Sequence, residues 1–279
     1  MTLRSYREAA RVAARRALAE DLAGYGDITG SAFAGLGAAR VVGREAGVLS
    51  GAAALEATAE LVDPALRVEM LVADGARFAA GATVARLSGP LAAILAAERT
   101  GLNLLCRLSG VATLTAQYVA EAAGSGARIA ATRKTTPGLR ALEKEAVVHG
   151  GGTPHRFGLF DGALVKDNHV AAAGGVRAAV DLVRAGSAHL HGLEVEVDTL
   201  EQLDEALAAG AGLVLLDNMD TLTVRAAVER VAGRALVEVS GGVTLERVRE
   251  LAAAGVDIIS VGALTTRARW LDLALDLEV

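Results

Sequence analysis

The second half of the chain repeats one pattern, and this pattern restricts the possible folds more than any other feature. Six short apolar runs each end in a polar residue or glycine, and helical stretches separate the later ones. Because these runs are apolar nearly throughout, we expect a parallel sheet covered on both faces. The expected strands occupy residues 128–132, 162–165, 192–195, 213–216, 235–239 and 256–261, with helices at 200–208, 222–231 and 245–253.

Each of these strands carries its polar residue at its carboxyl end. In a (β/α) barrel those ends converge on one mouth, where the chemistry of such folds is found. In a doubly wound sheet the polar residues would instead gather at one switch point. Their even distribution favours a barrel, and the lack of a GxGxxG motif argues against dinucleotide binding.

The pattern of expected helices and strands in the first hundred residues indicates a separate α+β unit. A helix is expected over residues 4–22 and a strand near 38–45. Ser50 is a plausible N-cap for a helix that continues to Val62. A meander with tight turns follows, and then a long helix over 91–123 that we expect to be interrupted near Ser109-Gly110.

Composition excludes several classes of function. The 279 residues are 52% apolar, which is ample for a core, yet no apolar run approaches the roughly 20 residues that a membrane span needs. A net charge of −5 without a basic arm argues against nucleic acid as the main partner. Cys106 is the single cysteine and lies in an apolar helical stretch, so we expect a core residue in a cytoplasmic protein.

A positive segment interrupts this mildly acidic chain. Residues 128–169 hold seven Lys and Arg against four Asp and Glu, and all three lysines of the chain lie there. Elsewhere the chain uses arginine, so lysine marks places where a compact, movable donor is needed. The expected cations at the barrel mouth suit a ligand with several carboxylates or phosphates; they are Arg133, Lys134, His155, Arg156 and Lys166.

Carboxylates and glycines complete the expected mouth. Glu196 and Asp217 end neighbouring strands, where they can hold a divalent metal or accept hydrogen bonds from sugar hydroxyls. Asp198 and Asp220 are expected to cap the next helices, and Glu194 and Glu238 to be buried, paired carboxylates and not ligands. Two glycine sites favour a terminal phosphate; they are Ser240-Gly241-Gly242 and Gly262-Ala263.

Long, ordered motifs give the chain a family resemblance. Thr132–Arg140, the segment from Gly150 to Leu159, and Lys166–His169 resemble quinolinate phosphoribosyltransferases, the carboxylating nicotinate-nucleotide pyrophosphorylases. The likeness spans nearly the whole chain. Further matching motifs lie at residues 20–29, 98–103, 109–113, 240–242 and 255–265.

The resemblance implies a fold and an assembly. We expect an N-terminal α/β sandwich over residues 1–108, with residues 270–279 returning to it, and an incomplete α/β barrel over 109–269. A homodimer is implied, in which the N-terminal domain of one subunit closes the barrel mouth of the other. Arg99 would then reach the site from the partner subunit.

The resemblance also implies a reaction. Quinolinate and 5-phosphoribosyl 1-pyrophosphate would give nicotinate mononucleotide, pyrophosphate and CO2 with Mg2+, in NAD biosynthesis. Thr132 and the five cations at the mouth would line the dicarboxylate and pyrophosphate region. The residues expected to be catalytic are Lys134, Lys166, Glu196 and Asp217. Glu196 and Asp217 would serve the ribose and the metal. The 5′-phosphate would be bound by Ser240, Gly241, Gly242, Gly262 and Ala263.

One departure from the family and three alternatives accompany this hypothesis. Thr266-Arg267 stands where the family often has His-Ser, which makes Arg267 a candidate substitute for the histidine. A related protein associated with molybdenum transport shares some of the motifs. A Schiff-base aldolase would use Lys166 as its amine. A protein that binds phosphoribosyl ligands without turnover is the non-enzymatic alternative.

Overall fold

A computed structural model describes residues 3–278, which form two compact units. The first unit comprises residues up to 116 together with 135–151 and from 264 onward; the second comprises 117–134 and 152–263. The expected boundary between residues 108 and 109 therefore falls inside a helix, and the expected domain limits stay a prediction. No described helix is both long and apolar enough to cross a membrane.

The first unit is built on an antiparallel sheet in the order β12-β1-β5-β3. Its C-terminal strand pairs with β1, so residues 273–278 lie in the sheet of the N-terminal unit. The strands are β1 (Leu36–Gly43), β3 (Arg67–Met70), β5 (Thr83–Pro90) and β12 (Leu273–Glu278), with a small ladder of β2 (Gly47–Val48) and β4 (Arg77–Phe78) beside them.

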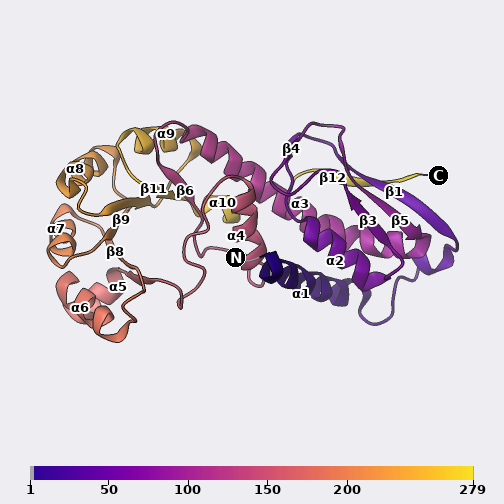
Figure 1. Cartoon of the computed structure of the whole chain (residues 1–279), viewed down its shortest axis with the longest axis horizontal. Helices are drawn as coiled ribbons and strands as arrows, with labels where there is room; N and C mark the ends of the chain where they lie inside the picture. Colours follow the sequence, from indigo (N-terminus) through magenta and orange to yellow (C-terminus); the bar gives the residue numbers. More distant parts are fainter. Residues whose placement is uncertain (1–2, 279) are drawn as a thin grey trace. The chain divides into compact units, whose positions relative to one another are not determined.

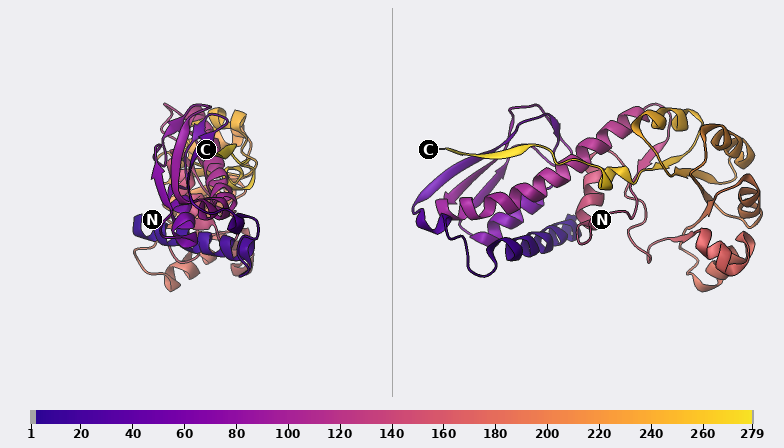
Figure 2. Two further views of the ribbon diagram at one scale, coloured as in Figure 1. Left: turned by 90° about the vertical axis from the view of Figure 1, so that its right-hand side faces the viewer. Right: turned by 180° about the vertical axis from the view of Figure 1, so that it is seen from behind.

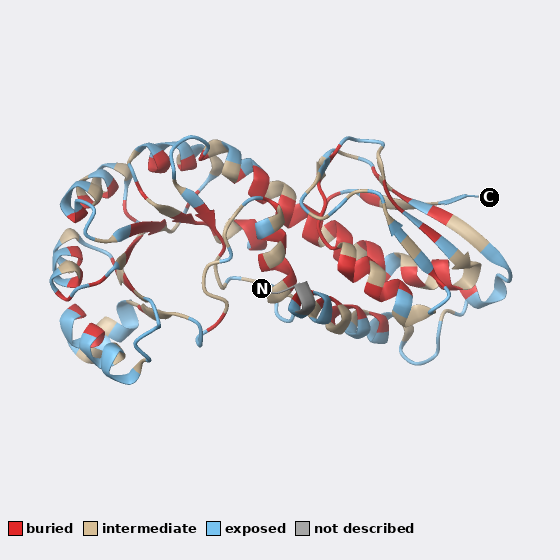
Figure 3. Cartoon of the chain, viewed as in Figure 1, coloured by how far each residue is buried: buried red, intermediate tan, exposed pale blue. Residues whose placement is uncertain are grey.

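Helices cover one face of this sheet. Figures 1 and 2 show α2 and α3 lying along it, and Figure 3 shows buried residues along both helices. Leu55, Leu87 and Ile94 meet in the core between them. The helical elements are α1 (Leu3–Leu22), η1 (Gly30–Ala32), α2 (Ala52–Val62), α3 (Leu91–Glu121) and α4 (Arg140–His149), with α10 (Ala263–Thr266) starting at the unit boundary.

Two local expectations for this unit are wrong. Helix α3 runs without interruption through Ser109-Gly110, because the Ser109 hydroxyl bonds the backbone of Ser50 and Gly110 lets the Arg269 carbonyl approach closely. Ser50 does not cap α2 either. The N-cap is Gly51 at φ +112°, and the carboxylate of Asp74 accepts the hydrogen bond from the N–H of Ala52.

The second unit is a parallel sheet of six strands in the order β6-β11-β10-β9-β8-β7. Among the described residues no ladder joins the edge strands β6 and β7, so the barrel is incomplete, as expected from the family. The strands are β6 (Arg128–Ala130), β7 (Ala163–Val165), β8 (Leu193–Val197), β9 (Leu213–Asp217), β10 (Leu236–Ser240) and β11 (Ile258–Ser260).

Helices line the outer face of this curved sheet (Figure 1). Side chains alternate along each strand, and those facing the helices are small aliphatics such as Val195, Val214 and Val239, all inaccessible to solvent. The polar residues therefore face the inside of the curve. The helices are α5 (Asp167–Ala173), α6 (Val176–Gly186), α7 (Leu200–Ala208), α8 (Thr221–Val231) and α9 (Leu245–Ala253).

Candidate active site

A cavity of about 400 Å³ lies where the parallel strands end in the second unit. Strand alternation explains its lining, because residues two apart on one strand share the inner face. Nine of the fourteen predicted site residues border it; they are Thr132, Arg133, Lys134, His155, Arg156, Lys166, Glu196, Asp217 and Ser240. A larger cavity of about 900 Å³ opens at the strand starts, but it lacks the lysines and the strand-end carboxylates.

The cations occupy one part of this cavity. Arg133 and Arg156 both line it, and burial together with the charge of Arg133 lowers the pKa of Arg156. The Arg156 Nη1 donates to the carbonyl of Gly162 at 3.1 Å, which orients the side chain. Because like charges repel, such an arrangement favours binding of an anion between or beside the two groups.

Lys166 and Glu196 form an ion pair across the ends of β7 and β8. The last residue of the motif Lys166–His169 also contacts its first residue. The His169 Nδ1 accepts a hydrogen bond from the backbone N–H of Lys166 at 2.9 Å. His169 thus fixes the start of α5 at Lys166. This pairing between the two predicted catalytic residues was not anticipated from the sequence.

Asp217 and the glycine segment lie beside each other at the ends of β9 and β10. The Asp217 carboxylate accepts a hydrogen bond from the Asn218 side chain at 2.7 Å. Gly241 has φ +90°, and a Cβ there would meet the Asn218 Oδ1 at 2.2 Å. Only glycine fits at that position without displacing Asn218.

Gly262 brings the other end of the cavity close to Lys134. A Cβ on Gly262 would lie 3.1 Å from the Lys134 Cδ and 3.8 Å from the Thr132 hydroxyl. The backbone N–H of Lys134 donates to that hydroxyl at 3.1 Å. The glycine therefore lets the lysine side chain pass over the backbone, next to Ala263 at the start of α10.

His155 differs from the other predicted cations in having two carboxylate partners. Its Nε2 lies 3.5 Å from the Glu194 Oε2 and 3.2 Å from the Glu238 Oε1. Burial lowers the pKa of His155, but these two carboxylates outweigh burial and raise it to about 9. The N–H of Arg156 points at Nδ1 at 2.7 Å and favours the neutral ring. Burial in turn raises the pKa of Glu194.

Several sequence expectations need comment here. Arg99 lies on α3 in the first unit, pairs loosely with Glu98 at 3.7 Å and does not line this cavity. Asp220 caps α8 as expected, whereas α7 is capped by Thr199 and not by Asp198. Cys106 is buried as expected. Glu238 and Ser260 line the cavity but were not among the predicted site residues. Each lies two residues before a predicted one, Ser240 or Gly262, which places it on the same inner face of its strand.

Comparison with known proteins identifies the family. Residues 27–109 match the N-terminal domain of quinolinate phosphoribosyl transferase and residues 111–276 match its C-terminal domain. A nicotinate-nucleotide pyrophosphorylase [carboxylating] from Mycobacterium leprae is 48% identical over 280 residues, covering 97% of this chain and 98% of that protein. A probable one from Bacillus subtilis is 42% identical over 93% of this chain and 90% of its own length.

Solved structures agree with this result. The nicotinate-nucleotide pyrophosphorylase from Francisella tularensis superposes with a TM-score of 0.94 at 36% identity, covering 98% of this chain and 97% of that one. The match therefore includes both units and the strand ends that carry the cavity. The chain belongs to the quinolinate phosphoribosyltransferase family.

Proposed function

We propose that this chain transfers the phosphoribosyl group of 5-phosphoribosyl 1-pyrophosphate to quinolinate, giving nicotinate mononucleotide, pyrophosphate and CO2. One observation carries the proposal most directly: two arginines, Arg133 and Arg156, line a cavity that also holds two strand-end carboxylates. A dicarboxylate neutralises the first pair, while ribose hydroxyls suit the second. The family to which the chain belongs supports the same reaction.

Positioning and electrostatics supply the catalysis in this proposal. The arginines hold the two carboxylates of quinolinate, so that its ring nitrogen faces the anomeric carbon of the sugar. The N–C bond forms as the C–O bond to pyrophosphate breaks, and Lys134 and Lys166 offset the charge of the departing group. The positively charged ring then accepts the electron pair of the C–C bond as CO2 leaves, and a proton replaces the carboxylate.

Glu196 and Asp217 are the residues that we propose for Mg2+. Both are carboxylates, whose hard oxygen atoms suit this ion, and both line the cavity. The ion pair of Glu196 with Lys166 leaves room for few protein ligands, which fits an ion that retains waters and substrate oxygens. When bound, Mg2+ neutralises charge on the pyrophosphate.

The test mixes purified protein with quinolinate, 5-phosphoribosyl 1-pyrophosphate and Mg2+, and follows nicotinate mononucleotide by mass. A parallel reaction contains nicotinate in place of quinolinate. We expect product from quinolinate alone and its loss when the metal is chelated. A folded protein that gives no product from either acid contradicts the proposal and favours the molybdenum-associated relative or a binding protein.

The Schiff-base reading of Lys166 has weaker support. Its ammonium lies in an ion pair with Glu196, an arrangement suited to a charged donor and not to a nucleophilic amine. Borohydride treatment with a carbonyl substrate should therefore leave Lys166 unmodified. Covalent trapping at this residue would reverse the assignment.

A further inference from the structure

A second pair of carboxylates lies behind the strand-end pair, deeper inside the barrel. Glu194 precedes Glu196 by two residues on β8, and Glu238 precedes Ser240 by two residues on β10, so all four face inward. Glu194 is 5% exposed and Glu238 is 1% exposed. Carboxylates are seldom buried at this depth without a partner, because losing their hydration is costly.

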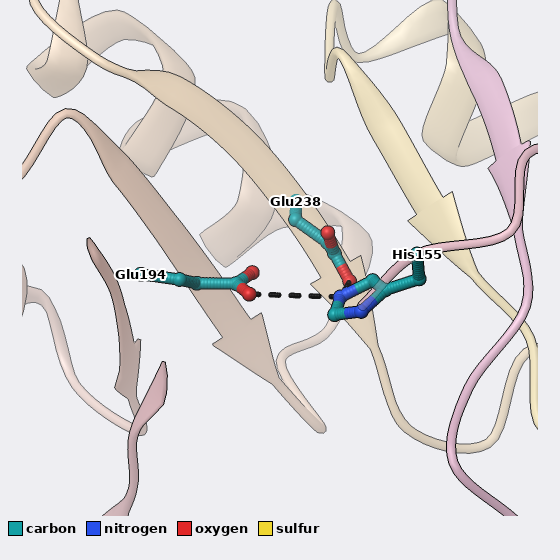
Figure 4. A group of neighbouring side chains, drawn as sticks. All are labelled: His155, Glu194 and Glu238. Carbon is teal, nitrogen blue, oxygen red and sulfur yellow. Dashed lines mark ion pairs between the residues drawn. The ribbon is translucent and has the colours of Figure 1, made fainter. Parts of the chain in front are cut away.

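Their shared partner is His155, as Figure 4 shows. The two carboxylates reach one ring nitrogen from strands that are separated by β9. When the ring is neutral, its hydrogen lies on Nε2, because Nδ1 accepts from the Arg156 N–H. When the ring is protonated, Nε2 still carries a hydrogen. In both charge states, then, Nε2 carries a hydrogen and lies within ion-pair distance of both carboxylates.

The backbone of His155 needs such an anchor. Its φ of +51° lies in the left-handed region, which residues other than glycine seldom adopt. Conformations of this kind persist where the surroundings hold them in place. The unusual backbone sets the direction of the next residue, Arg156, whose guanidinium lies beside the proposed dicarboxylate site. Holding the ring therefore also holds the arginine.

We propose that Glu194 and Glu238 are positioning residues for dicarboxylate recognition: they anchor the His155 ring, and through the adjoining backbone they orient Arg156. This inference rests on the proposed function, since it assigns Arg156 to quinolinate. Glu194 and Glu238 act through His155 and do not themselves hold the substrate. The same three side chains have their potential ligand atoms within 4.8 Å of one another, so the test must also exclude a bound cation.

The experiment compares Glu238→Leu, Glu194→Leu and Glu238→Gln in the full-length protein. The glutamine carbonyl can still accept from Nε2, whereas leucine fills the space without accepting. We expect each leucine variant to raise the KM for quinolinate about tenfold or more, with the KM for 5-phosphoribosyl 1-pyrophosphate within about twofold of wild type. Glu238→Gln should stay within about threefold for both substrates.

Asp257→Asn is the matched control. Asp257 supports the same part of the sheet by accepting a hydrogen bond from the N–H of Val237 at 2.8 Å, without contact to His155. We expect both KM values to be unchanged in this variant. The two leucine variants approach the histidine from different strands, so failure of one to fold leaves the other as a test.

A second readout needs no activity. Long-range 1H–15N correlation spectra of the histidines, recorded above the His155 pKa of about 9 where the ring is neutral, should show His155 in the wild type with its hydrogen on Nε2, and a mixture of tautomers in the leucine variants. The proposal would be overturned if the leucine variants kept the wild-type tautomer and their two KM values were either unchanged or changed by the same factor. A stoichiometric metal ion in the purified protein that Glu238→Leu removes would also overturn it. An inactive wild type with the expected spectra would refute only the proposed function.

Discussion

At the scale of single residues, Lys134 is the sharpest test of the site. It lines the cavity and crosses the backbone at Gly262, close to the proposed phosphate region. We expect Lys134→Ala to reduce kcat/KM by about 10²- to 10³-fold, because a donor to developing charge is lost. Steady-state kinetics measures the effect.

The control for this variant is Arg177→Ala and not a lysine substitution. Arg177 is an exposed cation on α6 that pairs with Asp181. Lys144 also belongs to the positive segment, but it is only 2% exposed in α4, so its removal would disturb the fold. Equal, small losses in Lys134→Ala and Arg177→Ala would refute the role of Lys134.

The charge of His155 should respond to pH in a direction set by its carboxylate partners. Its pKa of about 9 exceeds the 6.5 of the unfolded residue, so the folded protein binds this proton more tightly. The associated stability is fully present below about pH 6.5 and is lost as the pH rises through about 9. Quinolinate should bind more weakly over the same interval, because a cation disappears.

Titration of His155 by NMR checks this prediction, with His155→Gln identifying the resonance. Glu194, Glu238 and the Arg156 N–H are the groups that face the ring. A midpoint at or below 6.5 would show that burial and the Arg156 N–H outweigh the two carboxylates.

At the scale of elements, a buried ion pair fixes the loop that follows Lys134. The Arg107 Nη2 lies 2.7 Å from the Glu143 Oε1, and the Arg107 Nη1 donates to the Ala268 carbonyl at 2.9 Å. Glu143 is inaccessible to solvent and also accepts from the N–H and hydroxyl of Thr136. One carboxylate thus connects α3, α4 and the loop after residue 134.

Removing this carboxylate should destabilise the protein strongly. Glu143→Ala leaves a largely buried guanidinium without its counter-charge, so we expect the free energy of unfolding to fall by about 3–5 kcal/mol. Urea unfolding followed by circular dichroism measures it. Asp204→Asn, which breaks an exposed pair with Arg230, should cost less than about 1 kcal/mol. Similar losses in the two variants would contradict the prediction.

Gly110 shows how packing overrides helix propensity in α3. Alanine normally stabilises a helix interior relative to glycine, yet a Cβ here would lie 2.0 Å from the Arg269 carbonyl oxygen. We expect Gly110→Ala to lower the free energy of unfolding by about 1–3 kcal/mol. Gly186→Ala in α6, where a Cβ meets nothing within 4 Å, is the control. A more stable Gly110→Ala protein would show that the 269–271 segment can move away.

At the scale of the whole molecule, the proposed homodimer makes a prediction that needs no structure of the assembly. If Arg99 serves the partner subunit, Arg99→Ala and Lys134→Ala are each inactive alone but complement each other when mixed. Half of the randomly re-formed dimers then carry one intact site of two, giving about a quarter of wild-type activity. Size-exclusion chromatography establishes the dimer, and no recovery on mixing would place Arg99 in its own subunit's site.

The repeated strands of the second unit were predictable because burial on both faces imposes a continuous apolar run that ends in a polar residue. The helices at 200–208 and 245–253 were expected at those same limits, since their apolar faces repeat with the helical period. Single residues were harder. The capping of α2 by Asp74 and the continuity of α3 depend on contacts between residues far apart in the chain, which local patterns do not contain.

The sequence alone determined the fold class and the set of charged residues at the strand ends, because the pattern along a strand is a local property. Its long motifs carried the resemblance to the family. Only the tertiary structure decided which charges meet. Lys166, after β7, pairs with Glu196 on the neighbouring strand β8. His155 pairs with Glu194 on β8 and with Glu238 on β10. The physical reason is that ion pairing depends on distance and burial in space, which arise only after the curved sheet brings separate strand ends together.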